Sequence, residues 1–277
     1  MRRFKLSWPI TVTSILLAVG MLRLSYWQWE RHLSKKAYIA KLEENLKKPP
    51  LTKEELLKIA LAEWPSYIHR RVIISGDYDF KHEMVLRNRR LDKVPGVHVL
   101  TPLKISGTSK FILVDRGFIP LEFSTPDKRT VFQKPKTISF TGLIKASVPR
   151  RPLSPRDPEA GPDKPWVDAW LRVNLDKIAK QLPFKILPVY LEIIPKNDSA
   201  ADIERNIIKS DSDKAEMLFL PSRALANKPV SRELSEYPVP VFNTVVPPGR
   251  HLGYVYEWAF MALGTLIGGL LLQLKRI

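Results

Sequence analysis

The sequence predicts a membrane protein of the α+β class, in which two terminal transmembrane helices flank an antiparallel, β-rich domain outside the cytoplasm. Two of the observations behind this prediction are apolar runs near the two ends, each long enough to cross a bilayer. The third is a middle of short segments rich in Val, Ile, Phe and Thr, which turn-forming residues separate. We expect the domain to resemble a barrel or a sandwich, with peripheral helices.

The first apolar run, Leu6–Leu22, follows Met-Arg-Arg-Phe-Lys, a beginning that signal peptides and membrane anchors share. No small-x-small cleavage site follows the run, and Trp27 and Trp29 continue its aromatic character into an interfacial belt. These features favour an uncleaved anchor over a signal peptide. We therefore expect a cytoplasmic N-terminus over residues 1–7 and a transmembrane helix over residues 8–28.

The second apolar run is uncharged from Trp258 to Leu274, and it predicts a transmembrane helix over residues 253–274. Basic residues flank both runs at the chain ends, so the positive-inside rule places residues 1–7 and 275–277 in the cytoplasm. Residues 29–252 then form the domain outside. The first run leaves no room for a transit peptide before it, which favours the bacterial inner membrane; the mitochondrial inner membrane is the alternative.

The first half of the middle predicts helix and then strands. Residues 31–48 predict a charged continuation of the first helix that ends at Pro49 and Pro50. Thr52, with Glu55 three residues later, predicts a capped short helix that runs to Ala62. An antiparallel meander follows, with strands expected over 71–76, 84–88, 97–103, 111–116 and 137–144.

The second half of the middle is less regular. Prolines recur every three or four residues over 149–165, which favours an extended surface loop over a strand. A helix is expected over 175–181 and a strand over 189–194. Residues 196–236 are a charged insertion, which we expect to be helix and loop packed outside the sheet.

The chain is basic and lacks cysteine. Its formal net charge is +17. With the six basic residues beside the apolar runs and Glu257 set aside, 39 basic and 27 acidic residues remain, so the middle carries +12. Such a surface favours anionic lipid headgroups or an acidic partner. Nucleic-acid binding is not expected, because no basic run, zinc-finger spacing or RNP-like string is present. Without cysteine there are no disulfides and no thiolate sites for zinc or copper.

Motifs of common enzymes are missing, including GxSxG, HExxH, the phosphate-binding glycine loop and GxGxxG. His82 and Met84 around a turn are more typical of surface decoration than of a copper site. His32, His69 and His98 stand alone in polar or strand contexts, and we interpret them as solvated or hydrogen-bonded structural histidines.

His251 differs, because it lies at the outer mouth of the second span. An imidazole at this depth is costly unless it is hydrated, hydrogen-bonded to a partner or bound to a metal. Tyr254 and Trp258 share its helical face. A second polar and aromatic cluster, on nearly one face, stands at the outer mouth of the first span. It consists of Trp27, Gln28 and Arg31. Two clusters at one height predict a shared site; the alternative is an interfacial aromatic belt with a histidine among the headgroups.

Small residues recur four apart in both spans, as Gly264 and Gly268, with Gly269 beside them, in the second and as Ser14 and Ala18 in the first. This spacing lets two helix backbones approach closely in lipid. The alternative is that glycine is simply common in membrane helices.

Several segments, in order along the chain, resemble the surfeit locus protein 1 family. Leu24-Ser-Tyr-Trp-Gln-Trp-Glu-Arg31 is similar to the L-G-x-W-Q-x-x-R signature of the family's first span, and Lys35 fits its next basic position. His251-Leu-Gly-Tyr-Val-Tyr-Glu-Trp258 is similar to the H-L-x-Y-x-x-x-W of the second span. Five segments resemble strand blocks of the family: 70–72, 76–78, 98–103, 113–120 and 172–175. Segment 113–120 is similar to the V-x-R-G-W-x-P motif of the family.

The chain departs from the family pattern at a few places. Ser25 replaces the usual Gly, Ser34 stands where a Trp is common, Phe118 replaces Trp, and Gly249-Arg250 replaces Asn-rich residues. These differences concern fine positioning, chiefly at the membrane mouth.

The resemblance implies an assembly factor for haem-copper cytochrome c oxidase, not an enzyme, which helps haem a reach the catalytic subunit. The partners that it implies are that catalytic subunit, haem a synthase and membrane lipid. His251 is expected as the axial ligand of the haem iron. The other side chains expected around the haem are Tyr254, Trp258 and Trp27 along the macrocycle, Arg31 or Arg250 at the propionates and Gln28 at a polar substituent.

Two other functions stay open. One is a scaffold that holds an oxidase subunit without binding haem. The other is a membrane-anchored envelope enzyme that uses Arg116 or Asp115, although no nucleophile and base pair is visible. The structural interpretation of Arg116 and Gly117 is a strand-end turn with a salt bridge.

Overall fold

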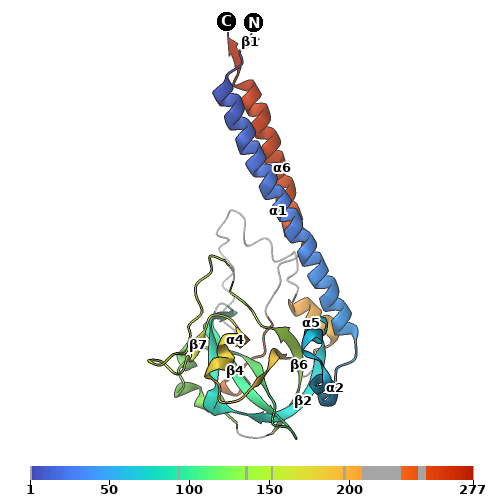
Figure 1. The fold of residues 1–277 in the computed structure, drawn as a ribbon, viewed down its shortest axis with the longest axis vertical. Coiled ribbons are helices and arrows are strands. Elements are labelled where there is room, and N and C mark those ends of the chain that lie inside the picture. Colours follow the sequence, from blue (N-terminus) through green and yellow to red (C-terminus); the bar gives the residue numbers. More distant parts are fainter. Residues whose placement is uncertain are drawn as a thin grey trace. The chain divides into compact units, whose positions relative to one another are not determined.

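The computed structural model of the chain describes residues 2–92, 94–134, 137–150, 152–195, 198–207, 232–242 and 248–276 (Figure 1). These residues belong to two compact units. One is a helix pair of residues 2–41 and 248–276. The other is a β-rich unit of residues 42–207 and 232–242. The predicted fold class is therefore confirmed.

The helix pair consists of α1 (Trp8–Lys47) and α6 (Pro248–Leu271), both long and apolar enough to cross a membrane. The two helices run antiparallel, side by side, and bring the two chain ends together (Figure 1). There, β1 (Arg2–Phe4) pairs with β9 (Leu274–Arg276). Helices suit a bilayer because they satisfy their backbone hydrogen bonds internally. As expected, α1 continues through its charged stretch and ends just before Pro49.

The β-rich unit is built on a closed barrel of five strands in the order β2, β6, β8, β5, β4, with β4 returning to β2. Its strands are β2 (Arg71–Tyr78), β4 (Val94–Ile105), β5 (Phe111–Pro120), β6 (Ile138–Ala146) and β8 (Ile186–Ile193). Two further strands lengthen the sheet at β4: β3 (Met84–Leu91), and β7 (Ala169–Trp170), which pairs with β3 in parallel.

The order of an antiparallel meander holds for β3, β4 and β5 only. β5 pairs in parallel with β8, and β2 pairs with β6 and β4 instead of with β3. Alternation and turn residues locate strands along the chain, but they do not specify which distant strand completes an edge. These long-range pairs close five of the strands into a barrel, and β3 and β7 extend the sheet beyond it.

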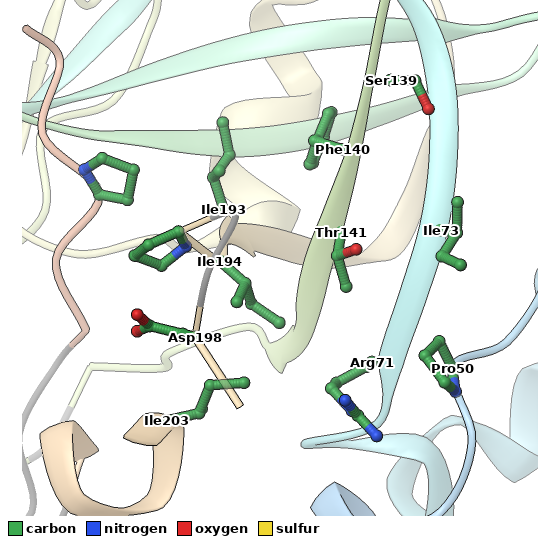
Figure 2. A pocket seen from close by; sticks show the side chains of 12 residues that line it. Pro50, Arg71, Ile73, Ser139, Phe140, Thr141, Ile193, Ile194, Asp198 and Ile203 are labelled. Carbon is green, nitrogen blue, oxygen red and sulfur yellow. The ribbon is translucent and has the colours of Figure 1, made fainter. Parts of the chain in front are cut away.

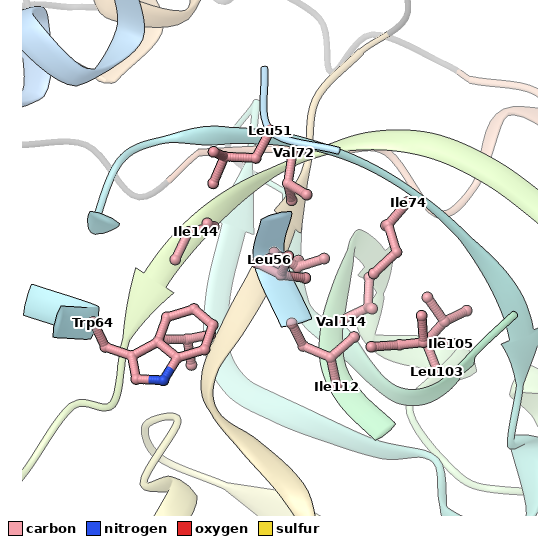
Figure 3. Packing of buried hydrophobic residues seen from close by; sticks show 12 residues of the cluster. Leu51, Leu56, Trp64, Val72, Ile74, Leu103, Ile105, Ile112, Val114 and Ile144 are labelled. Carbon is pink, nitrogen blue, oxygen red and sulfur yellow. The ribbon is translucent and has the colours of Figure 1, made fainter. Parts of the chain in front are cut away.

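Alternate residues of the strands fill the barrel. Ile112 and Val114 of β5 point into the core while Leu113 points away from it, because successive side chains of a strand face opposite sides. Two short helices, α2 (Lys53–Lys58) and α3 (Trp64–Tyr67), add Leu56 and Trp64 to the same core. The cluster comprises Leu51, Leu56, Trp64, Val72, Ile74, Leu103, Ile105, Ile112, Val114, Ile144, Val189 and Leu191 (Figure 3).

A second cluster covers the outer face of β5 and β8. Leu113 and Tyr190 pack there with Trp170 of β7 and with Leu175 of α4 (Leu175–Ile178). As a result, Ile112–Ile119 of β5 is buried at every position. This buried stretch also encloses the polar side chains of Asp115 and Arg116.

The helix expected to run to Ala62 ends at Lys58 instead, and a separate 3-10 turn, η1 (Leu61–Glu63), follows it. Thr52 caps α2 in a capping box with Glu55, as predicted. The described part of 149–165 contains turns and one isolated bridge between Gly161 and Lys164. In the charged insertion, residues 208–231 lie outside the described residues. The short helices of the unit are η1 (Leu61–Glu63), η2 (Phe80–His82), η3 (Leu121–Phe123), η4 (Lys128–Phe132), η5 (Ala179–Gln181), α5 (Ala200–Ile207) and η7 (Leu234–Glu236).

Candidate functional site

Hydrogen bonds fix the register of α1 against α6. Ser25 Oγ donates to the Val255 carbonyl oxygen at 2.9 Å, so the Ser that stands where the family has Gly joins the two helices. Ala18 and Ala262 lie seven residues further along each helix, and both are buried, with 3% and 2% of their surface exposed. Equal steps along antiparallel helices place these alanines opposite each other in the seam.

Gly269 allows the closest approach of the two helices. A Cβ atom at Gly269 would lie 2.1 Å from Ser14 Oγ, whereas one at Gly264 or Gly268 would meet nothing within 4 Å. The predicted packing of small residues therefore holds for α1, but on α6 it uses Gly269 and Ala262 instead of the GxxxG pair. Positions seven residues apart share a helical face, and the face that carries Gly264 points away from α1.

We expect Gly269→Leu to separate the helices, because the added side chain overlaps Ser14 and such overpacking costs about 1–3 kcal/mol. Gly264→Leu is the matched control, since space is open there. The cysteine-free chain permits an Ala18→Cys, Ala262→Cys pair as a reporter of seam contact. Disulfide yield in membranes should fall several-fold in the Gly269 variant and stay unchanged in the control. Equal yields in the two variants would contradict this packing.

The mouth of the helix pair, which we define as residues 25–35 of α1 and 248–258 of α6, contains the predicted site. Here His251 Nδ1 lies 2.8 Å from Gln28 Oε1. An amide oxygen only accepts hydrogen bonds, so Nδ1 carries the proton and donates it to Gln28. The Nε2 atom of a neutral imidazole in this tautomer keeps its lone pair. His251 is therefore a nitrogen donor held in one orientation by the facing helix.

The other predicted residues surround this pair without joining it. The Arg31 guanidinium lies 5.3 Å from the centroid of the Trp27 ring, and both side chains are exposed. Tyr254 and Trp258 are half-buried on α6. Among the described residues, no hydrogen bond or ring contact links these four side chains to His251 or Gln28.

His32 is also at the mouth, and sequence reasoning missed it. Its Nδ1 atom lies 2.9 Å from the Pro248 carbonyl oxygen, and its ring stacks on Trp29 with 5.6 Å between centroids. The interpretation as a hydrogen-bonded histidine is confirmed, but His32 does not stand alone. Its position four residues after Gln28 was a usable signal, because residues four apart share a helical face.

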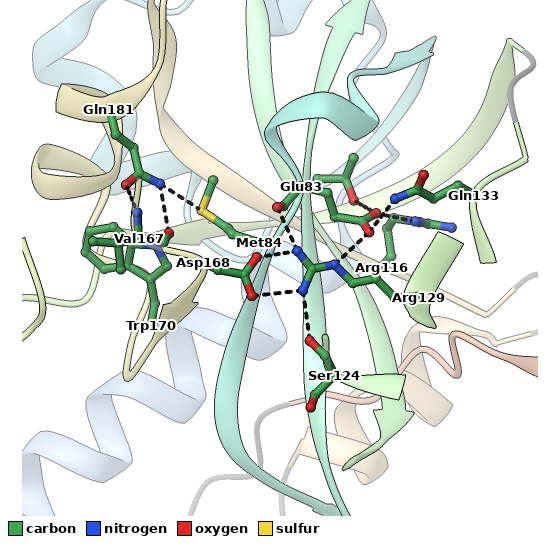
Figure 4. A network of polar contacts seen from close by, with 11 residues as sticks. Glu83, Met84, Arg116, Ser124, Arg129, Gln133, Val167, Asp168, Trp170 and Gln181 are labelled. Carbon is green, nitrogen blue, oxygen red and sulfur yellow. Dashed lines mark hydrogen bonds and ion pairs between the residues drawn. The ribbon is translucent and has the colours of Figure 1, made fainter. Parts of the chain in front are cut away.

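A buried polar cluster lies in the β-rich unit and centres on Glu83, which is 3% exposed (Figure 4). Its carboxylate accepts hydrogen bonds from Arg116 at 2.8 Å and from Thr101 at 2.9 Å, and it lies 3.2 Å from Arg129 Nε. Arg129 also forms a bidentate ion pair with Asp168. Two buried guanidinium groups thus balance two carboxylates. No local sequence pattern could have joined Glu83, Arg129 and Asp168, which lie far apart in the chain.

Arg116 belongs to this cluster because of a β-bulge. Val99 pairs with Gly117 and Leu100 with Asp115, so Arg116 is the extra residue of β5. Its guanidinium also donates to the Phe132 carbonyl oxygen at 2.6 Å and lies 4.9 Å from the Tyr78 ring centroid. The predicted salt bridge is confirmed, but the strand-end turn is wrong, because β5 continues to Pro120.

Burial raises the pKa of Tyr78, against the opposing effect of the Arg116 guanidinium, so the phenol stays neutral at physiological pH.

Asp115 is equally enclosed. It is 2% exposed, contacts His98 Nδ1 at 3.0 Å and accepts a hydrogen bond from the Gly117 amide at 2.9 Å. With Arg116 and Asp115 both saturated by internal partners, the geometry favours structural roles for these residues over the envelope enzyme.

A pocket of about 520 Å³ lies on the barrel beside α5, and none of the six predicted site residues lines it (Figure 2). Ile73, Ile193 and Ile203 contribute apolar walls, while Arg71 and Asp198 lie on opposite sides of it. Among the described residues, no group of three His, Cys, Asp or Glu side chains is placed to hold a metal ion.

Comparison with known proteins covers most of the chain. A model of the SURF1 family matches residues 15–263. The SURF1-like protein of Monosiga brevicollis is 30% identical over 132 residues, which cover 44% of this chain and 49% of that protein. Surfeit locus protein 1 of Mus musculus is 26% identical over 180 residues, or 60% of this chain and 56% of that protein. The SURF1-like protein of Rickettsia bellii is 26% identical over 196 residues, or 69% and 74%. The chain thus spans about half the length of the first two relatives.

Proposed function

Because this chain belongs to the SURF1 family, we propose that it is a membrane-bound assembly factor for haem-copper cytochrome c oxidase rather than an enzyme. We propose further that it holds haem a at the mouth of its helix pair and helps to insert it into the catalytic subunit of the oxidase. The observation that carries this second part is the contact of His251 with Gln28.

The donor set at the mouth fits a haem iron. Histidines that bind metals commonly donate their second ring N–H to an oxygen, which fixes the tautomer and the orientation of the ring. His251 meets this condition through Gln28 Oε1, and its Nε2 is the atom that would hold the iron. Since His251 already engages the amide oxygen of Gln28, we now assign Gln28 as a positioning residue instead of a contact to a polar substituent of the haem.

The charge at the mouth fits the two propionates that a haem carries. Arg31, Lys35 and Arg250 all lie close enough to His251 to act on its imidazole electrostatically. Lysine and arginine side chains stabilise carboxylates such as the propionates by forming ion pairs with them. Trp27 lies under Arg31, and Tyr254 and Trp258 continue along the α6 helix from His251, so aromatic surface is present for the macrocycle. When bound, haem a supplies the redox group that the oxidase requires.

The partners follow from the same proposal. Haem a synthase would supply the haem, the oxidase catalytic subunit would receive it, and lipid would surround α1 and α6. The β-rich unit would dock on the catalytic subunit. In the proposed topology the chain lies in the bacterial inner membrane, with both termini in the cytoplasm; the mitochondrial inner membrane is the alternative. The basic residues beside both apolar runs support this topology.

The full chain, purified from cells that make haem a, is expected to show a haem absorption spectrum. His251→Ala should weaken this spectrum and lower the haem content, and Gln28→Leu should weaken haem affinity about 10–100-fold, the usual cost of losing such a supporting contact. Phe260→Ala, an exposed position of the same helix outside the mouth, is the control and should leave the spectrum unchanged. Oxidase activity of a deletion strain measures the assembly role separately.

Two outcomes would contradict parts of this proposal. An unchanged spectrum and stoichiometry in His251→Ala would remove the ligand assignment. A haem-free chain that still co-purifies with the oxidase subunit would show the non-haem scaffold instead.

A further inference from the structure

The mouth holds a second histidine whose chemistry matches that of His251. His32 is half-buried, and its Nδ1 atom lies 2.9 Å from the carbonyl oxygen of Pro248. A carbonyl oxygen accepts and never donates, so Nδ1 of His32 carries the proton and Nε2 keeps its lone pair. The stacked ring of Trp29 further restricts the imidazole, with an angle of 23° between the two planes. His32 is therefore a second oriented nitrogen donor.

The two imidazoles lie in the same seam. Gln28 and His32 are four residues apart on α1, and Pro248 and His251 are three residues apart on α6, so each pair shares one helical face. The bonds from His251 to Gln28 and from His32 to Pro248 connect these two faces. The rings are therefore separated by one helical turn, roughly 5 Å along the axis.

We infer that His32 is a second nitrogen ligand of the metal centre that His251 binds. The inference rests on the proposed function and extends it, because it concerns a residue outside the family signature. A haem iron held at this mouth would therefore take one nitrogen from each of the two helices. In both histidines the second nitrogen is tied to an oxygen, as ligating histidines usually are.

The other histidines of the chain are placed differently. The sequence has five, and three of them belong to the β-rich unit. His69 and His98 are each 3% exposed, and the Nδ1 atom of His98 contacts Asp115. His82 contacts Asp79 and packs against the rings of Trp166 and Phe184. His32 is the histidine that shares the mouth with His251.

Two imidazole ligands make a haem iron six-coordinate, and a ferric haem with two axial imidazoles is low-spin, whereas one with a single imidazole is high-spin. The full chain loaded with haem a should therefore give a low-spin ferric electron paramagnetic resonance signal. His32→Ala should lose this signal and give a high-spin one while haem remains bound through His251. Added imidazole should restore the low-spin signal in His32→Ala.

A further variant separates ligation from structure. His32→Gln retains an amide N–H that can donate to the Pro248 carbonyl oxygen, but it has no ring nitrogen for a metal. It should show the high-spin signal of His32→Ala together with a wild-type melting temperature. Lys36→Ala, an exposed neighbour on α1, is the control and should stay low-spin.

The outcomes distinguish this inference from the proposed function. A low-spin signal that persists in both His32 variants overturns the role of His32, and so does a high-spin signal in the wild type. In either case, haem that stays bound through His251 leaves the proposed function intact. A wild-type chain without haem overturns the proposed function and this inference together.

Discussion

Arg129→Met is expected to destabilise the β-rich unit by about 3–5 kcal/mol, the usual cost of breaking a buried ion pair from one side. Arg129 is 2% exposed and holds both Glu83 and Asp168. Methionine fills similar space but leaves the Glu83 carboxylate with one guanidinium partner instead of two. For a unit of this size, the change lowers the melting temperature by roughly 10 °C.

The measurement is thermal unfolding of the full chain in detergent, followed by tryptophan fluorescence. Trp64 and Trp170 are 7% and 0% exposed in the two barrel clusters, so their emission reports on this unit. Lys128→Met is the matched control, because Lys128 is the exposed neighbour of Arg129. Equal melting temperatures for the two variants would show that the cluster does not stabilise the fold.

A double-mutant cycle with Glu83→Gln tests whether the cluster acts as one network. Arg129 and Glu83 share a bond, so removing both should cost less than the sum of the two single changes. Additive effects would instead mean that each side chain acts through separate partners. Glu83 also pairs with Arg116, the residue that an envelope enzyme would need free.

The sequence predicted most of the elements but few of their long-range contacts. Short segments rich in Val, Ile, Phe and Thr, with turn-forming residues between them, located β2, β4, β5 and β6, because such side chains are typical of strands. It could not predict the parallel pair of β5 with β8, since pairing partners leave no local pattern. The ion pair of Glu83 with Arg129 could not be predicted for the same reason, because the two residues are far apart in the chain and leave no local pattern.

The candidate site shows the same division. Helical periodicity placed His251 and Gln28 on faces at the mouths of two spans, and the structure joins these two by a hydrogen bond. Which side chains would touch depended on the rotation of α1 against α6, in which Gly269 faces Ser14 so closely that a Cβ atom would not fit. The sequence pattern favoured Gly264 and Gly268, because spacing within one helix does not reveal which face meets the partner.

Gly117→Ala is expected to detach the segment around Val239 from β5. Gly117 has a φ of +112°, a conformation that costs a residue with a side chain about 1–3 kcal/mol. A Cβ atom there would also lie 2.1 Å from the Val239 carbonyl oxygen, and backbone cannot move aside as a flexible side chain can. Relieving that overlap adds about 1–3 kcal/mol.

The two backbone hydrogen bonds between Phe118 and Val239, at 2.7 and 2.9 Å, should therefore break in Gly117→Ala. Limited proteolysis of the full chain should then cut residues 232–242 at least tenfold faster than in the wild type, since 1.4 kcal/mol of local opening already changes the open population tenfold. Gly161→Ala is the control, because a Cβ atom at Gly161 meets nothing within 4 Å. Cleavage of both variants at the wild-type rate would contradict this prediction. The need for glycine at position 117 would then come from the β-bulge that directs Arg116 toward Glu83, and not from the close approach of Val239.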